Sequence, residues 1–250
     1  MSKRLEEIYQ KNAEFEKTSP YNFCDRWCER CAHEKQIHCR LYKDELERKI
    51  TCIAHGKDED DPEITKAVME AQYKEVDEAL SEHMDKFGID LDNPDIDKNE
   101  LDEEDAIDLE DLPRDIQKHI RFVENNPLDN TVKNYSHKAH AFLKETFYGD
   151  KKMAREFRCD FETISWYHTL LPAKLNRALA GFHEPACEGD LALYDAVAQF
   201  QICKKAITQS IEALRRVSRH YVSFRSSIQV MLALLNNIHS RIEKMEEGIG

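Results

Sequence analysis

Apolar residues recur at alternating spacings of three and four along most of this chain, which is the spacing of one face of an α-helix. The spacing predicts helices over residues 2–17, 41–54, 62–87, 114–124, 128–148 and 153–180. Turn-forming residues stand at their ends: Pro62 opens one helix, and Gly56, Gly88 and Gly181 follow others. No strand-rich region interrupts them. The pattern therefore predicts an all-α protein.

The last stretch, residues 190–247, contains no Gly or Pro and carries a heptad repeat. Its first seam position recurs every seven residues, at Ile207, Leu214, Tyr221, Ile228, Leu235 and Ile242. The repeat is compatible with one long helix. We expect two antiparallel helices instead, with a break within residues 218–227, because that region is poor in strong helix formers and a bundle needs a returning helix.

Composition supports helices and a cytoplasmic location. The chain has 250 residues, 41% of them hydrophobic, with only 7 Gly and 7 Pro, whereas β-rich folds use many of both in turns. The N-terminus lacks the apolar stretch of a secretory signal, and the longest apolar run, 230–235, is far below the roughly 18 residues that span a membrane. Thiols stay reduced in the cytosol, so the 8 cysteines are expected to be ligands or buried residues.

The net charge of −13 is concentrated in one segment. Residues 88–112 contain twelve Asp or Glu and one Lys, which leaves a net charge of −2 for the rest of the chain. Such a segment buries too little apolar surface to offset its ordering entropy, so it is predicted to be a flexible linker. The expected organisation is a helical module over 1–87, an acidic linker over 88–112 and an antiparallel helical bundle over 113–250.

Half of the cysteines fall in one short window. Cys24, Cys28, Cys31 and Cys39 follow a C-x3-C-x2-C-x7-C pattern. The first three could share one buried helix face, but charged residues surround them where a core would use Leu or Ile. Clustered thiols in a reducing compartment are typical of a metal site. We predict that these four cysteines are metal ligands, and we rank His33 and His38 below Cys39 as the fourth.

Spacing alone leaves the metal open between a [4Fe–4S] cluster and Zn²⁺. Structural zinc is usually held by two separated C-x2-C pairs, whereas iron–sulfur clusters accept compact spacing, so iron–sulfur is slightly favoured. The radical enzymes that use S-adenosylmethionine have a similar triple spacing, but they need a barrel of parallel strands. The sequence predicts no strand-rich region, so we reject this class of enzyme. Trp27, between two ligands, is expected to cover the metal or to pack it against the helices.

Two blocks carry a resemblance to known proteins. The segment from Tyr21 to Cys31, YNFCDRWCERC, resembles the opening of a family of uncharacterised bacterial proteins with a YNxCDxWCxRC motif. The segment from Glu162 to Lys174 is similar to a second block of that family. The resemblance implies a bacterial source and a helical body, and it brings no known activity.

A second metal or catalytic site has weaker support. Glu162 and His168 lie on one predicted helix, and His137 and His140 lie on the preceding one. Di-iron sites in bundles use Glu-x-x-His pairs, which are absent from these helices. We therefore expect His168 to be a core histidine and His137 to be exposed. The remaining cysteines are expected to be buried and inert: Cys52, Cys159, Cys187 and Cys203.

The basic stretch from Arg215 to Arg225 interleaves arginines with aromatic residues, which suits contacts with phosphates and bases. Its aromatics also fall on the heptad seam, so a solvated helix face is the simpler interpretation. No Gly-rich phosphate loop or activated nucleophile assigns an enzymatic reaction. The expected function is metal binding in electron transfer or redox sensing, with the bundle facing a protein partner. A zinc-stapled interaction or scaffold protein is the alternative, and nucleic-acid binding is third.

Overall fold

A computed structural model describes residues 2–59, 61–87, 110, 112–183 and 190–249. All regular elements in these ranges are helices, which confirms the all-α prediction. The chain divides into two compact units, Met1–Cys31 with Pro113–Gly250, and Ala32–Leu112. The predicted boundaries differ from this division, because the first helix and three motif cysteines belong to the unit that contains the bundle. The predicted linker lies almost wholly outside the described residues.

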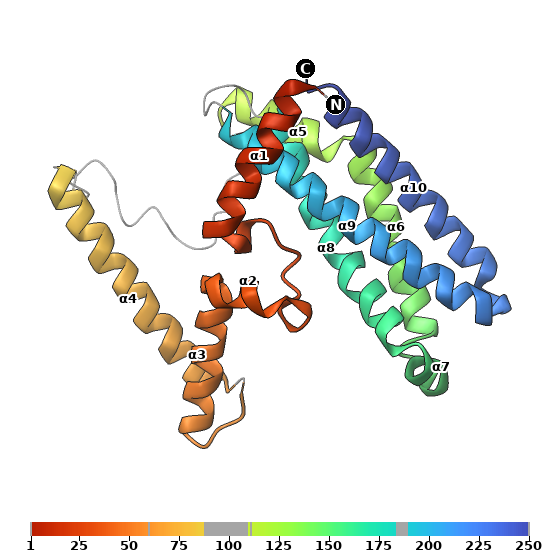
Figure 1. The fold of residues 1–250 in the computed structure, drawn as a ribbon, viewed down its shortest axis with the longest axis horizontal. Helices are drawn as coiled ribbons and strands as arrows, with labels where there is room; N and C mark the ends of the chain where they lie inside the picture. Colours follow the sequence, from red (N-terminus) through yellow and green to blue (C-terminus); the bar gives the residue numbers. More distant parts are fainter. Residues whose placement is uncertain (1, 60, 88–109, 111, 184–189, 250) are drawn as a thin grey trace. The chain divides into compact units, whose positions relative to one another are not determined.

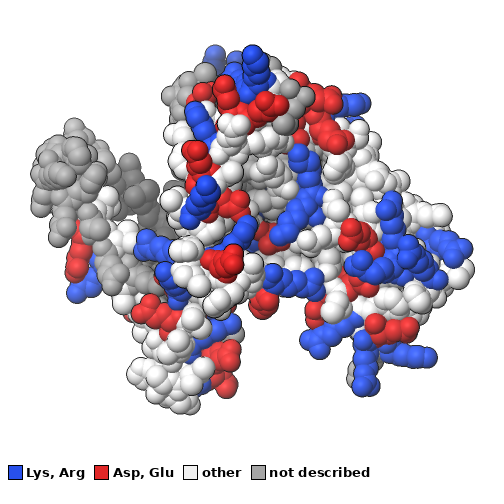
Figure 2. Space-filling view, in the orientation of Figure 1, with Lys and Arg blue, Asp and Glu red and all other residues white. Residues whose placement is uncertain are grey.

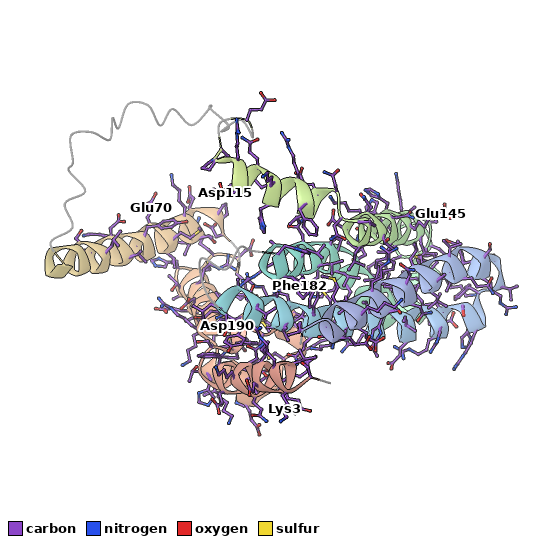
Figure 3. All side chains as sticks on the ribbon, turned by 90° about the horizontal axis from the view of Figure 1, so that it is seen from above. Lys3, Glu70, Asp115, Glu145, Phe182 and Asp190 are labelled. Carbon is purple, nitrogen blue, oxygen red and sulfur yellow. The ribbon has the colours of Figure 1, made fainter. Side chains whose placement is uncertain are left out.

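Four helices form the centre of the first unit: α6 (Pro127–Glu145), α8 (Arg158–His183), α9 (Leu191–His220) and α10 (Arg225–Glu247). Helix α8 packs along α9 and α6, and α10 packs along both α6 and α9 (Figure 1). Side chains of these helices meet between them to form one continuous core (Figure 3). Its largest fully buried members are Tyr135, Phe161, Tyr167 and Phe200.

The predicted break in the last stretch is confirmed. Helix α9 ends at His220, a short 3₁₀ turn (η5, Val222–Phe224) follows, and α10 begins at Arg225. The seam residues keep their predicted places, since Leu214, Ile228, Leu235 and Ile242 are fully buried. The heptad repeat therefore marks the inward faces of two consecutive helices rather than one long helix.

Two other predicted helices have different bounds. The helix predicted over 153–180 is divided at Phe157 into α7 (Lys151–Glu156) and α8. Phe157 leaves helical geometry, with φ −117° and ψ 33°, and its ring contacts His220 and Tyr221 at the end of α9. The helix predicted to reach residue 148 ends at Glu145, and Asp150 caps α7 by accepting hydrogen bonds from the amides of Lys152 and Met153.

Helix α1 (Lys3–Thr18) is held within the first unit by both apolar and polar contacts. Leu5 and Ile8 are buried with Val197 and Ile249. The Tyr9 hydroxyl donates to the Glu246 carboxylate at 2.9 Å, and Lys204 Nζ lies 2.6 Å from the same carboxylate. A short helix, α5 (Arg114–Glu124), precedes α6, whose first turn is capped by Asn126.

The second unit contains α2 (His33–His38), α3 (Arg40–Ala54) and α4 (Pro62–Phe87). Helices α3 and α4 pack together. The turn after α3 contains Gly56 with φ +67°, a left-handed conformation that glycine adopts without strain.

Candidate metal-binding segment

The first three motif cysteines lie on an irregular segment between α1 and α2. It begins with a 3₁₀ turn (η1, Pro20–Asn22) and ends with a second one (η2, Cys28–Arg30). Arg26 lies between Cys24 and Cys28 with φ +55°, which is uncommon for a residue other than glycine. A residue in this conformation persists when its surroundings hold it there, and the residues on both sides of Arg26 contact α8.

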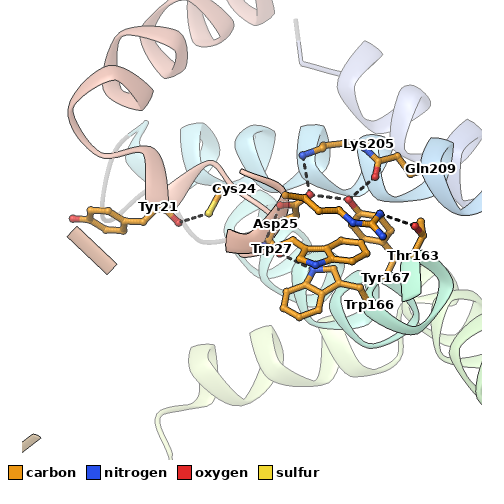
Figure 4. A network of polar contacts seen from close by, with 10 residues as sticks. Tyr21, Cys24, Asp25, Trp27, Thr163, Trp166, Tyr167, Lys205 and Gln209 are labelled. Atoms are coloured by element: carbon orange, nitrogen blue, oxygen red, sulfur yellow. Dashed lines mark hydrogen bonds and ion pairs between the residues drawn. The ribbon is translucent and has the colours of Figure 1, made fainter. Parts of the chain in front are cut away.

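Asp25 attaches this segment to α8 and α9 (Figure 4). Its carboxylate is buried, accepts a hydrogen bond from the Tyr167 hydroxyl at 2.7 Å, and lies 2.8 Å from Lys205 Nζ. Its backbone carbonyl accepts a hydrogen bond from Trp166 Nε1 at 2.9 Å. The Gln209 amide lies 2.8 Å from the Tyr167 hydroxyl and extends the network along α9.

The polar partners outweigh the cost of burying the Asp25 charge. Burial alone raises the pKa of Asp25, but hydrogen bonds from Lys205 and Tyr167 leave that pKa below its ordinary value. Burial and the neighbouring Asp25 carboxylate raise the pKa of Tyr167. Near neutral pH the pair is therefore a protonated phenol donating to a carboxylate, which is a strong charge-assisted hydrogen bond.

Trp27 and Arg30 add a second set of contacts with α8. The Trp27 ring stacks on Trp166, with centroids 5.3 Å apart and planes 22° from parallel. The Arg30 guanidinium lies 3.6 Å from the Trp27 ring centroid and donates a hydrogen bond to Thr163 Oγ1 at 2.9 Å. Trp27 thus packs against α8, a helix of the bundle. Its expected contact with a metal stays a prediction.

The four predicted ligands are divided between the two units. Cys24, Cys28 and Cys31 are half-buried in the first unit, and Cys39 is buried in the second, immediately before α3. Cys24 Sγ donates to the Tyr21 carbonyl at 3.5 Å. The donor set suits zinc or an iron–sulfur cluster, since both take thiolates. Among the described residues, no three His, Cys, Asp or Glu side chains are arranged to hold a metal ion, and the four-cysteine site remains a prediction.

Two of the histidines, His168 and His137, lie as expected from their helix positions. His168 is buried, and its Nδ1 lies 2.7 Å from the Ser165 carbonyl, which requires the proton on Nδ1. Burial lowers the pKa of His168. The His140 ring stacks on the His168 ring, with centroids 5.8 Å apart, and His137 is exposed. Glu162 instead pairs with two arginines, Arg158 at 2.7 Å and Arg30 at 3.5 Å.

The other cysteines follow the prediction in part. Cys52 and Cys203 are fully buried, and burial raises the pKa of the Cys203 thiol to about 12. The prediction for Cys159 is wrong, because it is exposed on the first turn of α8. Cys187 lies outside the described residues.

The basic stretch lies where α9 ends and α10 begins. Tyr221 donates to Glu156 at 2.8 Å, and Arg216 pairs with Asp160 at 2.8 Å. Phe224 contacts Phe142 in the core. Figure 2 shows Lys and Arg side chains on this end of the bundle, where Arg215 and Arg219 are exposed.

Three comparisons with known proteins found no counterpart: no family model matches the chain, and no curated protein or solved structure is significantly similar to it. Within the described residues, no helix is both long and apolar enough to cross a membrane.

The sequence did not reveal Asp25, Arg30, Trp166, Tyr167 and Lys205 as parts of one network. One signal was available: the residues between the cysteines include a carboxylate, an indole and a guanidinium, which are groups that form directional contacts. Their partners lie more than 130 residues away in the chain, and no local pattern identifies them.

Proposed function

We propose that this chain binds a metal through the thiolates of Cys24, Cys28, Cys31 and Cys39, and that it acts in electron transfer or redox sensing. A [4Fe–4S] cluster is the preferred occupant, because compact cysteine spacing suits clusters better than a single zinc ion. When bound, such a cluster supplies a one-electron couple. The four-helix bundle then provides the surface for a protein partner.

The observation that supports this proposal is the anchoring of the cysteine segment. Asp25, Trp27 and Arg30 lie between the first three thiols, and each contacts α8 or α9. A segment that served only as a connection would gain little from a buried carboxylate and a stacked indole at these positions. The three thiols are also half-buried, which limits the access of water to a bound group.

The alternative is a zinc-stapled interaction protein in which the metal only folds the cysteine region. The compact spacing of the cysteines argues against this alternative, although the same four cysteines would bind the zinc. The two proposals predict a different colour, metal content and redox activity for the purified protein. Measurements on one protein preparation therefore distinguish them.

The test is metal analysis and visible absorption of anaerobically purified protein. We expect a brown protein with about four irons per chain. Cys31→Ser should lose the colour, whereas Cys159→Ser, at an exposed thiol outside the motif, should keep it. A colourless protein with about one zinc would favour the stapled scaffold. Protein without either metal would refute the proposal.

A further inference from the structure

The contacts of the cysteine segment alternate with its thiols along the chain. Asp25 follows Cys24, Trp27 precedes Cys28, and Arg30 precedes Cys31. Every one of these residues is a direct chain neighbour of a predicted ligand. Fixing the three side chains on α8 and α9 therefore restricts the backbone that carries each thiol.

The network also accounts for the left-handed Arg26. Its neighbours on both sides are held, Asp25 by Lys205 and Tyr167, and Trp27 by the Trp166 ring. The Trp27 amide donates to Asp25 Oδ1 at 3.3 Å, which closes a turn around Arg26. This turn is the conformation that the free chain would rarely adopt.

We infer that Asp25, Trp27 and Arg30, together with Trp166, Tyr167 and Lys205, are positioning residues that set the metal affinity of the thiols. This inference rests on the proposed metal binding and deepens it. Holding the segment on the bundle removes conformational freedom before the metal binds, so less entropy is lost on binding. Residues that support metal ligands in this way typically change metal affinity about 10–100-fold when they are replaced.

The coupling is reciprocal. If the contacts with α8 and α9 favour metal binding, metal binding must stabilise the same contacts. The chain has 2 tryptophans, and they are the stacked pair Trp27 and Trp166, so their fluorescence is sensitive to this contact.

Lys205 offers the cleanest substitution, because a closely matched control exists in the same unit. The Lys205–Asp25 pair has an N–O distance of 2.8 Å, with side chains 53% and 11% exposed. The Arg216–Asp160 pair also has an N–O distance of 2.8 Å, with side chains 51% and 13% exposed, but Arg216 pairs with Asp160 and Glu212 and not with Asp25. Lys205→Gln and Arg216→Gln therefore remove similar ion pairs at different places.

The experiment is an anaerobic Co²⁺ titration of the full chain, followed by the thiolate charge-transfer absorption and by tryptophan fluorescence. We expect Lys205→Gln to bind Co²⁺ about 10-fold more weakly than the wild type, Lys205→Arg to restore most of the affinity, and Arg216→Gln to match the wild type. Tryptophan emission should change as Co²⁺ binds. Thermal unfolding of the metal-free variants checks that both glutamine variants are equally folded.

The outcomes separate the two proposals. Equal Co²⁺ affinity in Lys205→Gln and Arg216→Gln, with normal binding by the wild type, overturns the positioning role and leaves the metal site intact. Wild-type protein that gives no thiolate absorption at any Co²⁺ concentration overturns the proposed function and this inference with it.

Discussion

At the scale of single residues, Tyr135 is the clearest point where stability depends on pH. It is fully buried, and burial raises the pKa of its hydroxyl to about 12. Ser210 is near enough to lower that pKa slightly, yet among the described residues neither hydroxyl has a hydrogen-bond partner of ordinary geometry. The phenol therefore stays neutral in the folded state at a pH where the unfolded chain ionises.

This difference gives the sign of the effect. Because the folded pKa lies above the ordinary value of 10.0, the contribution of Tyr135 to stability is complete below pH 10 and is lost as the pH rises towards 12. The loss amounts to roughly 2–3 kcal/mol at about 1.4 kcal/mol per pKa unit. Tyr135→Phe should have nearly wild-type stability at pH 7. Above pH 10 its free energy of unfolding should fall less than that of the wild type, as measured by urea unfolding at several pH values. A loss of several kcal/mol at pH 7 would show that the hydroxyl has a partner.

At the scale of elements, Gly181 controls how closely α8 approaches α9. A Cβ at this position would lie 2.7 Å from the Ala192 carbonyl oxygen and 3.4 Å from the Ala196 Cβ. The helices meet here through small residues and backbone, which have no flexible side chain that could move aside.

Gly181→Ala should therefore destabilise the protein by about 1–3 kcal/mol through overpacking. Helix propensity alone predicts the opposite sign, since alanine is favoured over glycine in a helix by about 1 kcal/mol. Chemical unfolding distinguishes the two effects, and a variant more stable than the wild type would refute the close approach.

The elements also show what could be predicted from the sequence. Helix ends were predicted well where capping chemistry is local, as at Asn125-Asn126-Pro127, and the return between α9 and α10 followed from weak helix formers near Tyr221. The break at Phe157 is not predicted, because no Gly or Pro marks it, and the contact of its ring with Tyr221 joins residues far apart in the sequence.

The candidate site shows the same limit more strongly. The cysteine pattern identified the segment, since ligand types and spacing are properties of the local sequence. The pairing of Asp25 with Lys205 depends on which helix faces the segment, and helical periodicity shows only which side of a helix is buried.

At the scale of the whole molecule, the two units differ in how much each can bury and in charge. Among the described residues of 32–87, only Cys39 and Cys52 are buried, while Ile50, Ile53 and Tyr73 are more than half exposed. The sequence of Ala32–Leu112 carries a net charge of −17, and the remaining residues carry +4. Little apolar burial and strong like-charge repulsion both lower the stability of the second unit.

We therefore expect metal-free protein to unfold in two steps in urea. Both tryptophans belong to the first unit, so their fluorescence should follow only its unfolding, whereas far-ultraviolet circular dichroism reports on the helices of both units. The circular dichroism signal should begin to fall at lower urea concentration than the fluorescence changes. Non-coincident transitions are the standard sign of departure from two-state unfolding.

Adding salt should narrow the difference in urea concentration between the two transitions, because screening relieves the repulsion among carboxylates of the second unit. Coincident curves at every salt concentration would show instead that the helices of Ala32–Leu112 are as stable as the bundle, despite their small buried surface.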